Sequence, residues 1–366
     1  MHVVIVIVIF VLVFAGLRFL VVLSNVFLFR NLASGEDRGD KSVAVLIPAR
    51  NEEDNIGNIL HDLSQQTIAG FEVLVYDDLS DDNTVKVIND NKIENTKVQL
   101  INGEELPKGW GGKNHACYQL AQHTNADILV FLDADVRIKA DFLHKITYHL
   151  TINKLDLLSI FPIQITSTIG EKIVVPLFNW ILLTLLPLRL VWKSSWSSFS
   201  AANGQCMVFN GETYRKNQWH KLIRAEVVED ISIMKEMKKR NCNVETLIGQ
   251  KEISCRMYHT FKESFNGLAR SAPAFFANNI LWAISFLGLV LIAPISLAYI
   301  NVWYLVWFGL FVILVRIIVA ILGKANILYM ILLHIPQMVV LLFIVLKGFN
   351  MRLKNRYQWK NREINF

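Results

Sequence analysis

The apolar residues of this chain are gathered into long segments at its two ends, and this limits the folds open to it. Hydrophobic residues make up 53% of the 366 residues. Residues 3–29 are almost all Val, Ile, Leu and Phe, interrupted by Arg18 and Asn25, and about 20 such residues suffice for a helix to cross a bilayer. The segment has neither the basic start nor the small-residue cleavage site of a signal peptide. We therefore predict a retained transmembrane anchor over residues 1–30.

The last third of the chain is apolar again and ends in a basic tail. Residues 280–300, 303–322 and 327–348 are each long enough to span a bilayer. We predict transmembrane or interfacial helices over 278–348, followed by a basic cytoplasmic tail over 349–366.

The positions of Lys and Arg predict the orientation in the membrane. Arg30, Arg38 and Lys41 follow the first apolar segment, and no Lys or Arg precedes it. Because basic residues favour the cytoplasmic side, we expect a multi-pass cell-membrane protein whose residues from 30 onward are cytoplasmic. A cytoplasmic middle and tail need an even number of crossings between them, whereas three segments are candidates. We expect one of the three to be interfacial or re-entrant; the alternative is that the tail lies outside.

The charge and cysteine content narrow the class of protein. The formal net charge of +6 comes largely from residues flanking the apolar segments, which suits an anionic membrane surface and does not suggest nucleic acid as a partner. The four cysteines have no C-x-x-C spacing, as is typical of free thiols in a reduced cytosolic domain.

The middle of the chain alternates strand and helix patterns and is predicted to be a cytosolic domain over residues 41–270. The expected strands are 42–47, 71–76, 98–101 and 128–132, and the expected helices are 52–66, 81–88, 113–122 and 231–240. A β-α-β-α order predicts an α/β fold with an open, mostly parallel sheet. Ligands of such sheets bind at the carboxyl ends of the strands.

Acidic pairs follow the strands at the ends where ligands are expected. Asp133 and Asp135 come after the apolar run 128–132, and an extended backbone would aim both to the same side. Two such carboxylates can hold a divalent metal, which neutralises a diphosphate, although a lone pair could equally be a solvated turn. Asp77–Asp78 repeats the pattern upstream, and Glu229–Asp230 is a third acidic pair. Three acidic pairs in this order predict a nucleotide-sugar site.

These motifs together resemble those of family 2 glycosyltransferases of the GT-A fold, over residues 43 to about 270. The matching segments are Ile47–Glu53, Asp77-Asp78-x-Ser80-x-Asp82-x-Thr84, Asp133-Ala134-Asp135 and Glu229-Asp230. Leu106–Ala116 is similar to the membrane-bound branch that includes carotenoid- and hopanoid-associated glycosyltransferases and, more distantly, ceramide glucosyltransferases. The tail Trp359-Lys360-Asn361-Arg362 resembles the Trp-Lys-Gly-Arg ending of that branch, with Asn361 in place of Gly.

The resemblance implies roles for the residues of these motifs. The metal ligands would be Asp133 and Asp135, with Asp135 the more direct ligand of Mg²⁺ or Mn²⁺. Lys113 follows a Gly-rich turn and opens a helix, which also suits a diphosphate, although it could be a surface lysine. The residues expected to hold the nucleotide sugar are Pro48, Ala49, Arg50, Glu52, Asp77, Asp78, Lys113, Asp133 and Arg270.

Catalysis of transfer needs a base near the acceptor. By resemblance Asp230 is that base and Glu229 positions it, whereas the plainer interpretation is a pair of acids in the first turn of a helix. The residues expected to bind the acceptor are Asn203, Gly204, Gln205 and Trp110.

Residues 173–192 are apolar but lie between the metal motif and the predicted base. A crossing there would separate the two motifs on opposite sides of the membrane. We therefore predict an interfacial or re-entrant element that could admit a lipid acceptor; the alternative is ordinary core.

The expected activity is inverting transfer of a single hexose from a nucleotide sugar, with UDP-glucose favoured. The expected acceptor is a hydroxyl or carboxyl of a lipid such as a carotenoid or related isoprenoid or polyene. A processive polysaccharide synthase is disfavoured, because residues 266–271 replace the Gln-x-x-Arg-Trp motif of processive members. A non-catalytic membrane scaffold is the remaining alternative.

Overall fold

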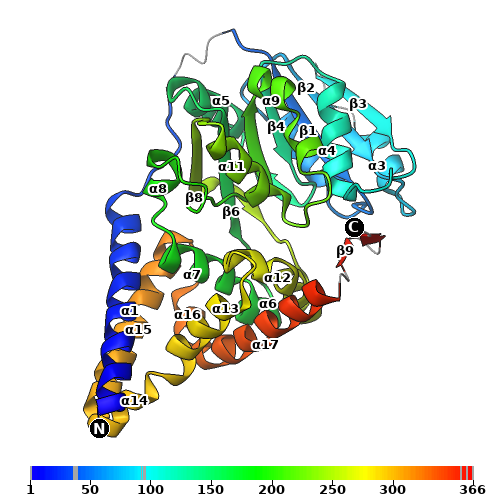
Figure 1. Ribbon diagram of the computed structural model, residues 1–366. Coiled ribbons are helices and arrows are strands. Elements are labelled where there is room, and N and C mark those ends of the chain that lie inside the picture. The colour runs from blue at the N-terminus through cyan, green and yellow to red at the C-terminus, as the bar shows by residue number, and fades with distance from the viewer. Residues whose placement is uncertain are drawn as a thin grey trace. The chain divides into compact units, whose positions relative to one another are not determined.

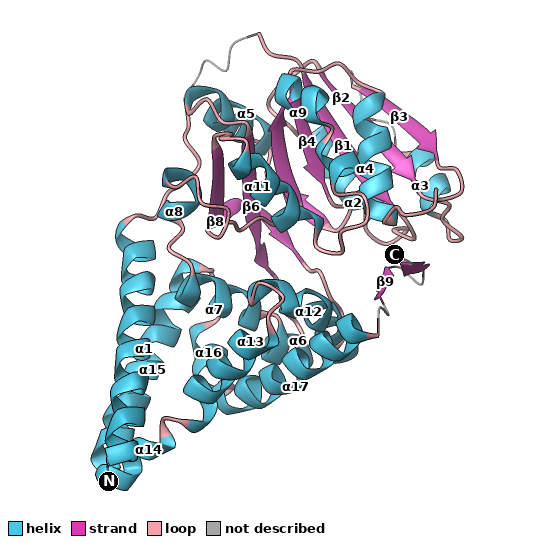
Figure 2. Cartoon of the chain, viewed as in Figure 1, coloured by secondary structure: helices cyan, strands magenta, loops and turns pink. Residues whose placement is uncertain are grey.

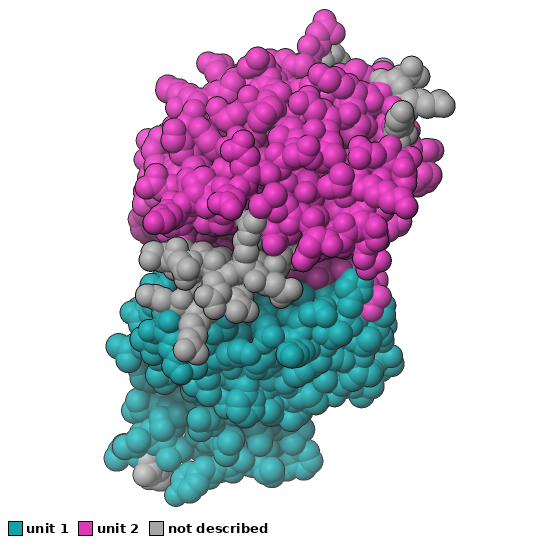
Figure 3. All heavy atoms as spheres, turned by 90° about the vertical axis from the view of Figure 1, so that its right-hand side faces the viewer, with its two compact units in different colours: residues 1–29, 166–189, 258–355 teal, residues 30–165, 190–257, 356–366 magenta. Residues whose placement is uncertain are grey.

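The computed structural model describes residues 2–35, 40–91, 93, 96–354, 357–359 and 362–364. Arg38, Lys360 and Asn361 lie outside the described residues. The chain divides into two compact units (Figure 3). Unit 1 comprises residues 1–29, 166–189 and 258–355, and unit 2 comprises residues 30–165, 190–257 and 356–366.

Unit 2 is built on an eight-stranded sheet with the order β3-β2-β1-β4-β7-β6-β8-β5 (Figure 1). Its first four strands are parallel. These are β1 (Val43–Ala49), β2 (Phe71–Asp77), β3 (Lys97–Asn102) and β4 (Ile128–Leu132). The predicted mostly parallel α/β sheet is thus confirmed.

The second half of the sheet mixes strand directions. β7 (Cys206–Asn210) runs antiparallel to both β4 and β6 (Leu157–Gln164), and β8 (Val244–Cys255) is parallel to β6. β5 (Val136–Ile138) pairs antiparallel with β8. Because β7 is antiparallel to β4, the residues just before β7 lie beside the carboxyl end of β4. The Asp133 N–H donates to the Gln205 carbonyl at 3.1 Å at this point.

Helices pack over this sheet (Figure 2). They are α2 (Ile56–Ser64), α3 (Thr84–Asp90), α4 (Gly112–Gln122), α5 (Phe142–Ile152), α9 (Gly211–Asn217), α10 (Trp219–Leu222) and α11 (Glu229–Lys239), with α8 (Arg189–Lys193) at the unit boundary. Every residue of β4 is buried, as expected for a central strand covered on both faces. Three predicted helix starts are wrong: α2 begins at Ile56 rather than Glu52, α3 begins at Thr84 rather than Asp81, and α11 already includes Glu229 and Asp230.

The described residues of unit 1 form helices joined by loops (Figure 2). They are α1 (His2–Phe27), α6 (Ile169–Val174), α7 (Pro176–Leu185), α12 (Phe261–Phe275), α13 (Ile280–Leu287), the π-helix η1 (Gly288–Ile292), α14 (Ile295–Ile300), α15 (Val302–Leu322), α16 (Ile327–Leu332) and α17 (His334–Leu353). In unit 2, β9 (Tyr357–Trp359) and β10 (Arg362–Ile364) pair as a separate two-stranded sheet.

Three helices among the described residues, α1, α15 and α17, are long and apolar enough to cross a membrane. The predicted segments 280–300 and 327–348 are not single helices, because the first is interrupted at Ala293 and Pro294 and the second at Leu333. A fourth span is possible by composition if α12 and residues 280–292, which are bent by 108°, count as one.

The apolar element predicted over 173–192 is divided among α6, α7 and α8, and each of these helices is too short to cross a bilayer alone. Leu177, Trp180 and Leu183 of α7 are buried. Most of this element belongs to unit 1, with the long apolar helices. Its location at the membrane interface stays a prediction.

Candidate active site

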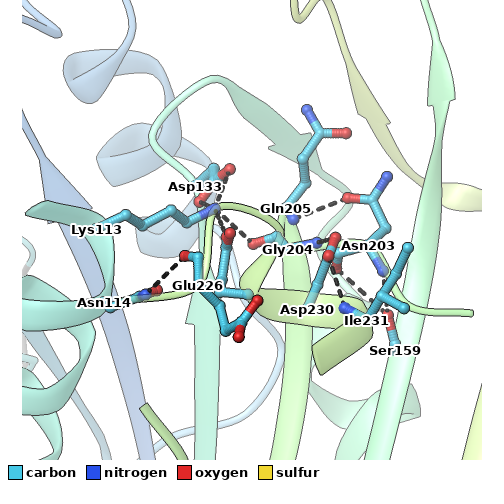
Figure 4. Close-up of polar contacts among 11 residues, drawn as sticks. Lys113, Asn114, Asp133, Ser159, Asn203, Gly204, Gln205, Glu226, Asp230 and Ile231 are labelled. Carbon is cyan, nitrogen blue, oxygen red and sulfur yellow. Dashed lines mark hydrogen bonds and ion pairs between the residues drawn. The ribbon is translucent and has the colours of Figure 1, made fainter. Parts of the chain in front are cut away.

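Lys113 lies at the centre of a polar cluster formed by four segments of unit 2. Its Nζ atom is 2.7 Å from Asp133 Oδ1 and 3.2 Å from Glu229 Oε1, and it donates to the Gly204 carbonyl at 3.1 Å. The Gly204 N–H in turn donates to Asp230 Oδ2 at 2.9 Å (Figure 4). We call these five residues the lysine cluster. The fold thus brings the predicted diphosphate, metal, acceptor and base residues together.

The pKa values of the two acids at the start of α11 are shifted in opposite directions. Burial and the neighbouring Glu229 charge raise the pKa of Asp230 to about 7. Although burial favours its protonated form, the Lys113 charge holds the pKa of Glu229 below its usual value. Near neutral pH, Glu229 is therefore an ion-pair partner and Asp230 can exchange a proton. A base with a pKa near the working pH is efficient.

Asp133 and Asp135 lie in a turn, so the expected extended backbone is wrong. β4 ends at Leu132, and Ala134 and Asp135 turn the chain toward β5. Burial and the charge of Asp135, opposed by Lys113, raise the pKa of Asp133 to about 7. Asp135 also accepts a hydrogen bond from the Cys255 thiol. The two carboxylates therefore still repel each other even with Lys113 beside Asp133.

This acidic pair fits a divalent metal held jointly with a diphosphate. Within the described part of the chain, no three His, Cys, Asp or Glu side chains form a group that could hold a metal. Mg²⁺ in nucleotide sites is typically bound by one or two carboxylates and completed by phosphate oxygens and water. A cation between Asp133 and Asp135 would also relieve their mutual repulsion. The residues present are therefore compatible with a divalent cation, and their role as its ligands stays a prediction.

The predicted nucleotide motifs meet at the adjoining ends of β1 and β2. Ala49 pairs in register with Asp77, and Pro48 precedes it on β1. The Asp78 N–H donates to the Ala49 carbonyl at 2.8 Å, and Arg50 donates to the Asp78 carbonyl. One carboxylate oxygen of Asp77, Oδ1, is buried without a hydrogen-bond partner among the described residues. This oxygen is an acceptor that a ribose or base could satisfy.

Glu52 lies in the turn that follows β1. Its backbone N–H donates to Thr84 Oγ1 at 2.8 Å, and its carboxylate accepts from Asn55 at 2.8 Å. These bonds hold the turn against the start of α3, beside the end of β2. A nucleotide-binding role for Glu52 stays a prediction.

Asn203 and Gln205, predicted to bind the acceptor, are buried, with exposed fractions of 7% and 1%. Gln205 Nε2 donates to Cys255 Sγ at 2.7 Å, and its Oε1 accepts from Gln164 at 2.9 Å. Asn203 Oδ1 accepts from the Gln205 N–H at 2.8 Å. These amides brace the turn that contains Gly204, and their contact with an acceptor stays a prediction.

Trp110 and Arg270 are the other two predicted binding residues. Trp110 packs against His115 and Tyr118, with ring centroids 5.3 and 5.2 Å apart. Arg270 lies on α12 and belongs to unit 1. Its proposed phosphate contact stays a prediction.

Asn114 holds the loop that leads into α11, and the sequence patterns did not indicate this. Its side-chain amide donates to the carbonyls of Ile223, Arg224 and Glu226 at 3.1–3.2 Å, as Figure 4 shows for Glu226. These contacts tie the start of α4 to the loop that leads into α11. Its position directly after Lys113 was the one available signal, because its partners lie more than a hundred residues away.

Gly204→Ala is expected to lower activity by about tenfold or more while leaving the thermal unfolding temperature nearly unchanged. A methyl group there would meet Glu229 Oε1 at 2.8 Å and Lys113 Nζ at 3.0 Å, so it would push this ion pair apart. Initial rates and melting curves test this. Gly16→Ala, which adds a methyl group with nothing within 4 Å, is the control, and equal rates for both variants would contradict the prediction.

Comparisons with known proteins bear on the family and the fold. The glycosyl transferase family 2 model matches residues 44–193. The chain is 29% identical over 277 residues to the 4,4'-diaponeurosporenoate glycosyltransferase of Staphylococcus haemolyticus (strain JCSC1435), covering 70% of this chain and 71% of the relative. It is 27% identical over 275 residues to the protein of the same name from Staphylococcus aureus (strain USA300), covering 71% and 70%.

A solved structure supports the fold. The mannosyltransferase PcManGT from Pyrobaculum calidifontis, in complex with GDP-Man and Mn²⁺, is similar with a TM-score of 0.59 and 17% identity, over 94% of this chain and 98% of that one. At this identity the likeness shows the fold alone. The solved structure supports the GT-A-like fold, and the family match and the curated relatives identify the chain as a glycosyltransferase of family 2, distantly related to the diaponeurosporenoate glycosyltransferases.

Proposed function

We propose that this protein is a membrane-bound, metal-dependent, inverting glycosyltransferase that moves one hexose from a nucleotide sugar to a lipid. The observation that carries the proposal is the lysine cluster. It holds one ammonium group between the metal motif and the acids of α11, within a hydrogen bond of the backbone that positions Asp230. A base on one side and a positive charge on the other suit a single displacement, in which a proton leaves the acceptor as negative charge develops on the leaving group.

Asp230 is the proposed base. Its carboxylate takes the proton of the acceptor hydroxyl as the acceptor oxygen bonds to the anomeric carbon, and the bond from that carbon to the diphosphate oxygen breaks. The Gly204 and Ile231 N–H groups, at 2.9 and 2.7 Å, orient the two carboxylate oxygens. A single displacement inverts the anomeric configuration, and the cluster marks no separate nucleophile for a second one.

Lys113 and the acidic pair act on the leaving group. Asp133 and Asp135 are the residues that would hold Mg²⁺ or Mn²⁺, and a bound divalent cation offsets the charge of a departing diphosphate. The pKa of Lys113 lies well above its usual value, because the charges of Asp133 and Glu229 outweigh the effect of burial. Lys113 therefore stays protonated and stabilises negative charge throughout the reaction.

The donor and acceptor are proposed by analogy. The motif resemblance favours UDP-glucose, whereas PcManGT was solved with GDP-Man, so the test must include both. The curated relatives are named for diaponeurosporenoate, a carotenoid carboxylate, and three helices suit a membrane. We infer a carotenoid or related polyene lipid as acceptor, with the catalytic unit in the cytoplasm.

The purified full-length protein, incubated with membrane lipids, Mn²⁺ or Mg²⁺ and a panel of nucleotide sugars, is expected to add one hexose to a lipid. The expected result in lipid mass spectrometry is a single-hexose mass increase. It should disappear when EDTA removes the metal and return when metal is restored in excess. Without the cation, the two negative carboxylates would repel the diphosphate instead of offsetting its charge.

Other outcomes would contradict this proposal in distinct ways. Long sugar chains on the product would indicate a processive synthase. Nucleotide binding without transfer from any donor would favour the alternative of a non-catalytic membrane scaffold. Undiminished transfer in EDTA would remove the metal from the mechanism.

A further inference from the structure

Two arginines in the apolar helices of unit 1 have no role in the transfer chemistry. Arg18 lies on α1 and Arg316 on α15, both of which are candidate membrane spans. Their guanidinium carbons are 4.4 and 4.5 Å from the ring centroid of Trp180 on α7. Three helices of unit 1 thus place two positive charges against one aromatic side chain.

The polar contacts of these arginines are with neutral groups. Arg18 donates to Thr184 Oγ1 at 2.8 Å, and Arg316 donates to Gln337 Oε1 at 2.7 Å. Arg316 also approaches the Met338 sulfur at 3.7 Å. The Nε atom of each guanidinium is buried without a hydrogen-bond partner in the described structure. Donor capacity is therefore left over on both groups.

No carboxylate neutralises either arginine within the described residues. Unit 1 has two acidic residues there, Glu171 and Glu263. Glu171 accepts hydrogen bonds from Ser167 and Thr168 at the start of α6. Glu263 accepts from the His259 N–H at 3.0 Å. Charged groups inside apolar helices normally pair with an opposite charge or face a polar path, so the missing counter-charge calls for a ligand.

We propose that Arg18 and Arg316 form a binding site for the oxyanion headgroup, carboxylate or phosphate, of an amphiphile dissolved in the membrane. A guanidinium matches both headgroups through paired N–H donors. Arg316 is 1% exposed, whereas Arg18 is half-buried. A ligand would therefore approach the pair from the Arg18 side chain. Leu17 and Leu20 beside it are 58% and 61% exposed, which suits an acyl or polyene chain. This inference does not depend on the proposed transfer reaction.

The test measures lipid binding by the full-length protein in nanodiscs of zwitterionic lipid. Oleate, dioleoyl phosphatidic acid and oleyl alcohol are titrated at alkaline pH, where the acids are ionised, and binding is followed by native mass spectrometry. At least one of the two anions is expected to bind about tenfold or more tightly than the alcohol. Tighter binding of oleate identifies a carboxylate, and tighter binding of phosphatidic acid identifies a phosphate.

Variants locate the binding on the arginines. Arg18→Gln and Arg316→Gln are each expected to reduce the preference for the anion about tenfold. Arg352→Gln, which removes the same charge from an exposed position of unit 1, should retain it. Arg18→Lys keeps the charge but loses the paired N–H donors, so it should preserve part of the preference, which covers the case in which a glutamine variant fails to fold.

Three results would overturn the proposal. Equal affinity of the wild-type protein for the anions and the alcohol would do so without any variant. An equal loss in Arg352→Gln would show that general surface charge attracts the lipid. A fall in unfolding temperature in the glutamine variants with the anion preference unchanged would show that the arginines only join helices around Trp180.

Discussion

Asp230→Asn is expected to lower kcat for transfer to a hydroxyl acceptor by about 10²–10⁴-fold, the usual contribution of a general base. Asparagine keeps the size of the side chain and one oxygen acceptor for the Gly204 or Ile231 N–H, but it cannot take the acceptor proton. Nucleotide-sugar affinity should stay close to that of the wild type, because Asp230 lies on the acceptor side of the lysine cluster in the proposed mechanism. Rates and donor binding are measured in parallel.

The pH dependence gives a second readout of the same residue. The pKa of Asp230 is raised to about 7, so its carboxylate, the active form, is lost as the pH falls through about 7. The wild-type kcat should therefore rise between pH 6 and 8, roughly as the fraction of ionised base, and this step should be smaller in Asp230→Asn, in which Asp133, with a pKa also raised to about 7, still titrates. Asp54→Asn, on an exposed position of unit 2, is the control. Full activity of Asp230→Asn on a hydroxyl acceptor would exclude Asp230 as the base.

The same variant separates the two acceptor chemistries. A carboxylic acid is already ionised at neutral pH and needs no base before it attacks the anomeric carbon. If the natural acceptor is a carboxylate, as the names of the relatives suggest, Asp230→Asn should retain far more activity on it than on a matched alcohol. The acid-to-alcohol activity ratio of the variant, compared with the wild-type ratio, tests this directly.

Lys113→Met is expected to lower kcat/KM by about 10³-fold, within the range seen when one preorganised electrostatic contact to the transition state is removed. Methionine has a similar length and no charge, so the ion pairs to Asp133 and Glu229 at 2.7 and 3.2 Å are lost. Since the Lys113 charge lowers the pKa of both carboxyls, both should protonate more readily, and the rate should rise with pH over a higher range.

Two further variants sharpen the interpretation of Lys113→Met. Lys108→Met removes the same charge from an exposed position of the loop before α4 and should leave kcat/KM nearly unchanged. Lys113→Arg keeps the charge with a different geometry and should recover part of the activity. If Lys113→Met behaved like Lys108→Met, the ammonium would have no part in catalysis, and its ion pairs would be structural.

Much of the fold followed from local patterns. The predicted strands 71–76 and 128–132 agree with β2 and β4 to within one residue, and the helix at 113–122 agrees with α4. Apolar runs bounded by acids and turns report on nearby residues alone, so they can be interpreted without knowledge of the rest of the chain. The same reasoning placed Asp77, Asp78 and Asp133 at strand ends.

The apolar C-terminal third was harder to interpret, because hydropathy counts residues and does not detect helix breaks. Residues 280–300 have the composition of a span, yet the structure divides them into α13, η1 and α14. Pro294 lacks the N–H that a continuing helix would need. Composition therefore predicted the membrane-compatible character of this region correctly and the number of continuous helices wrongly.

The sequence by itself determined the family and the chemical groups of the site, because the motifs are short and each forms at the end of one local element. Only the tertiary structure decided what these groups do to one another. Lys113 contacts Asp133, 20 residues away in the sequence, and the Gly204 carbonyl, 91 residues away. The second contact exists because β7 lies antiparallel beside β4. The proton affinities of Glu229 and Asp230, adjacent in the chain, diverge because one side chain reaches Lys113 and the other is buried beside a negative charge. Burial and cross-strand distance are properties of the packed chain, and no local pattern encodes them.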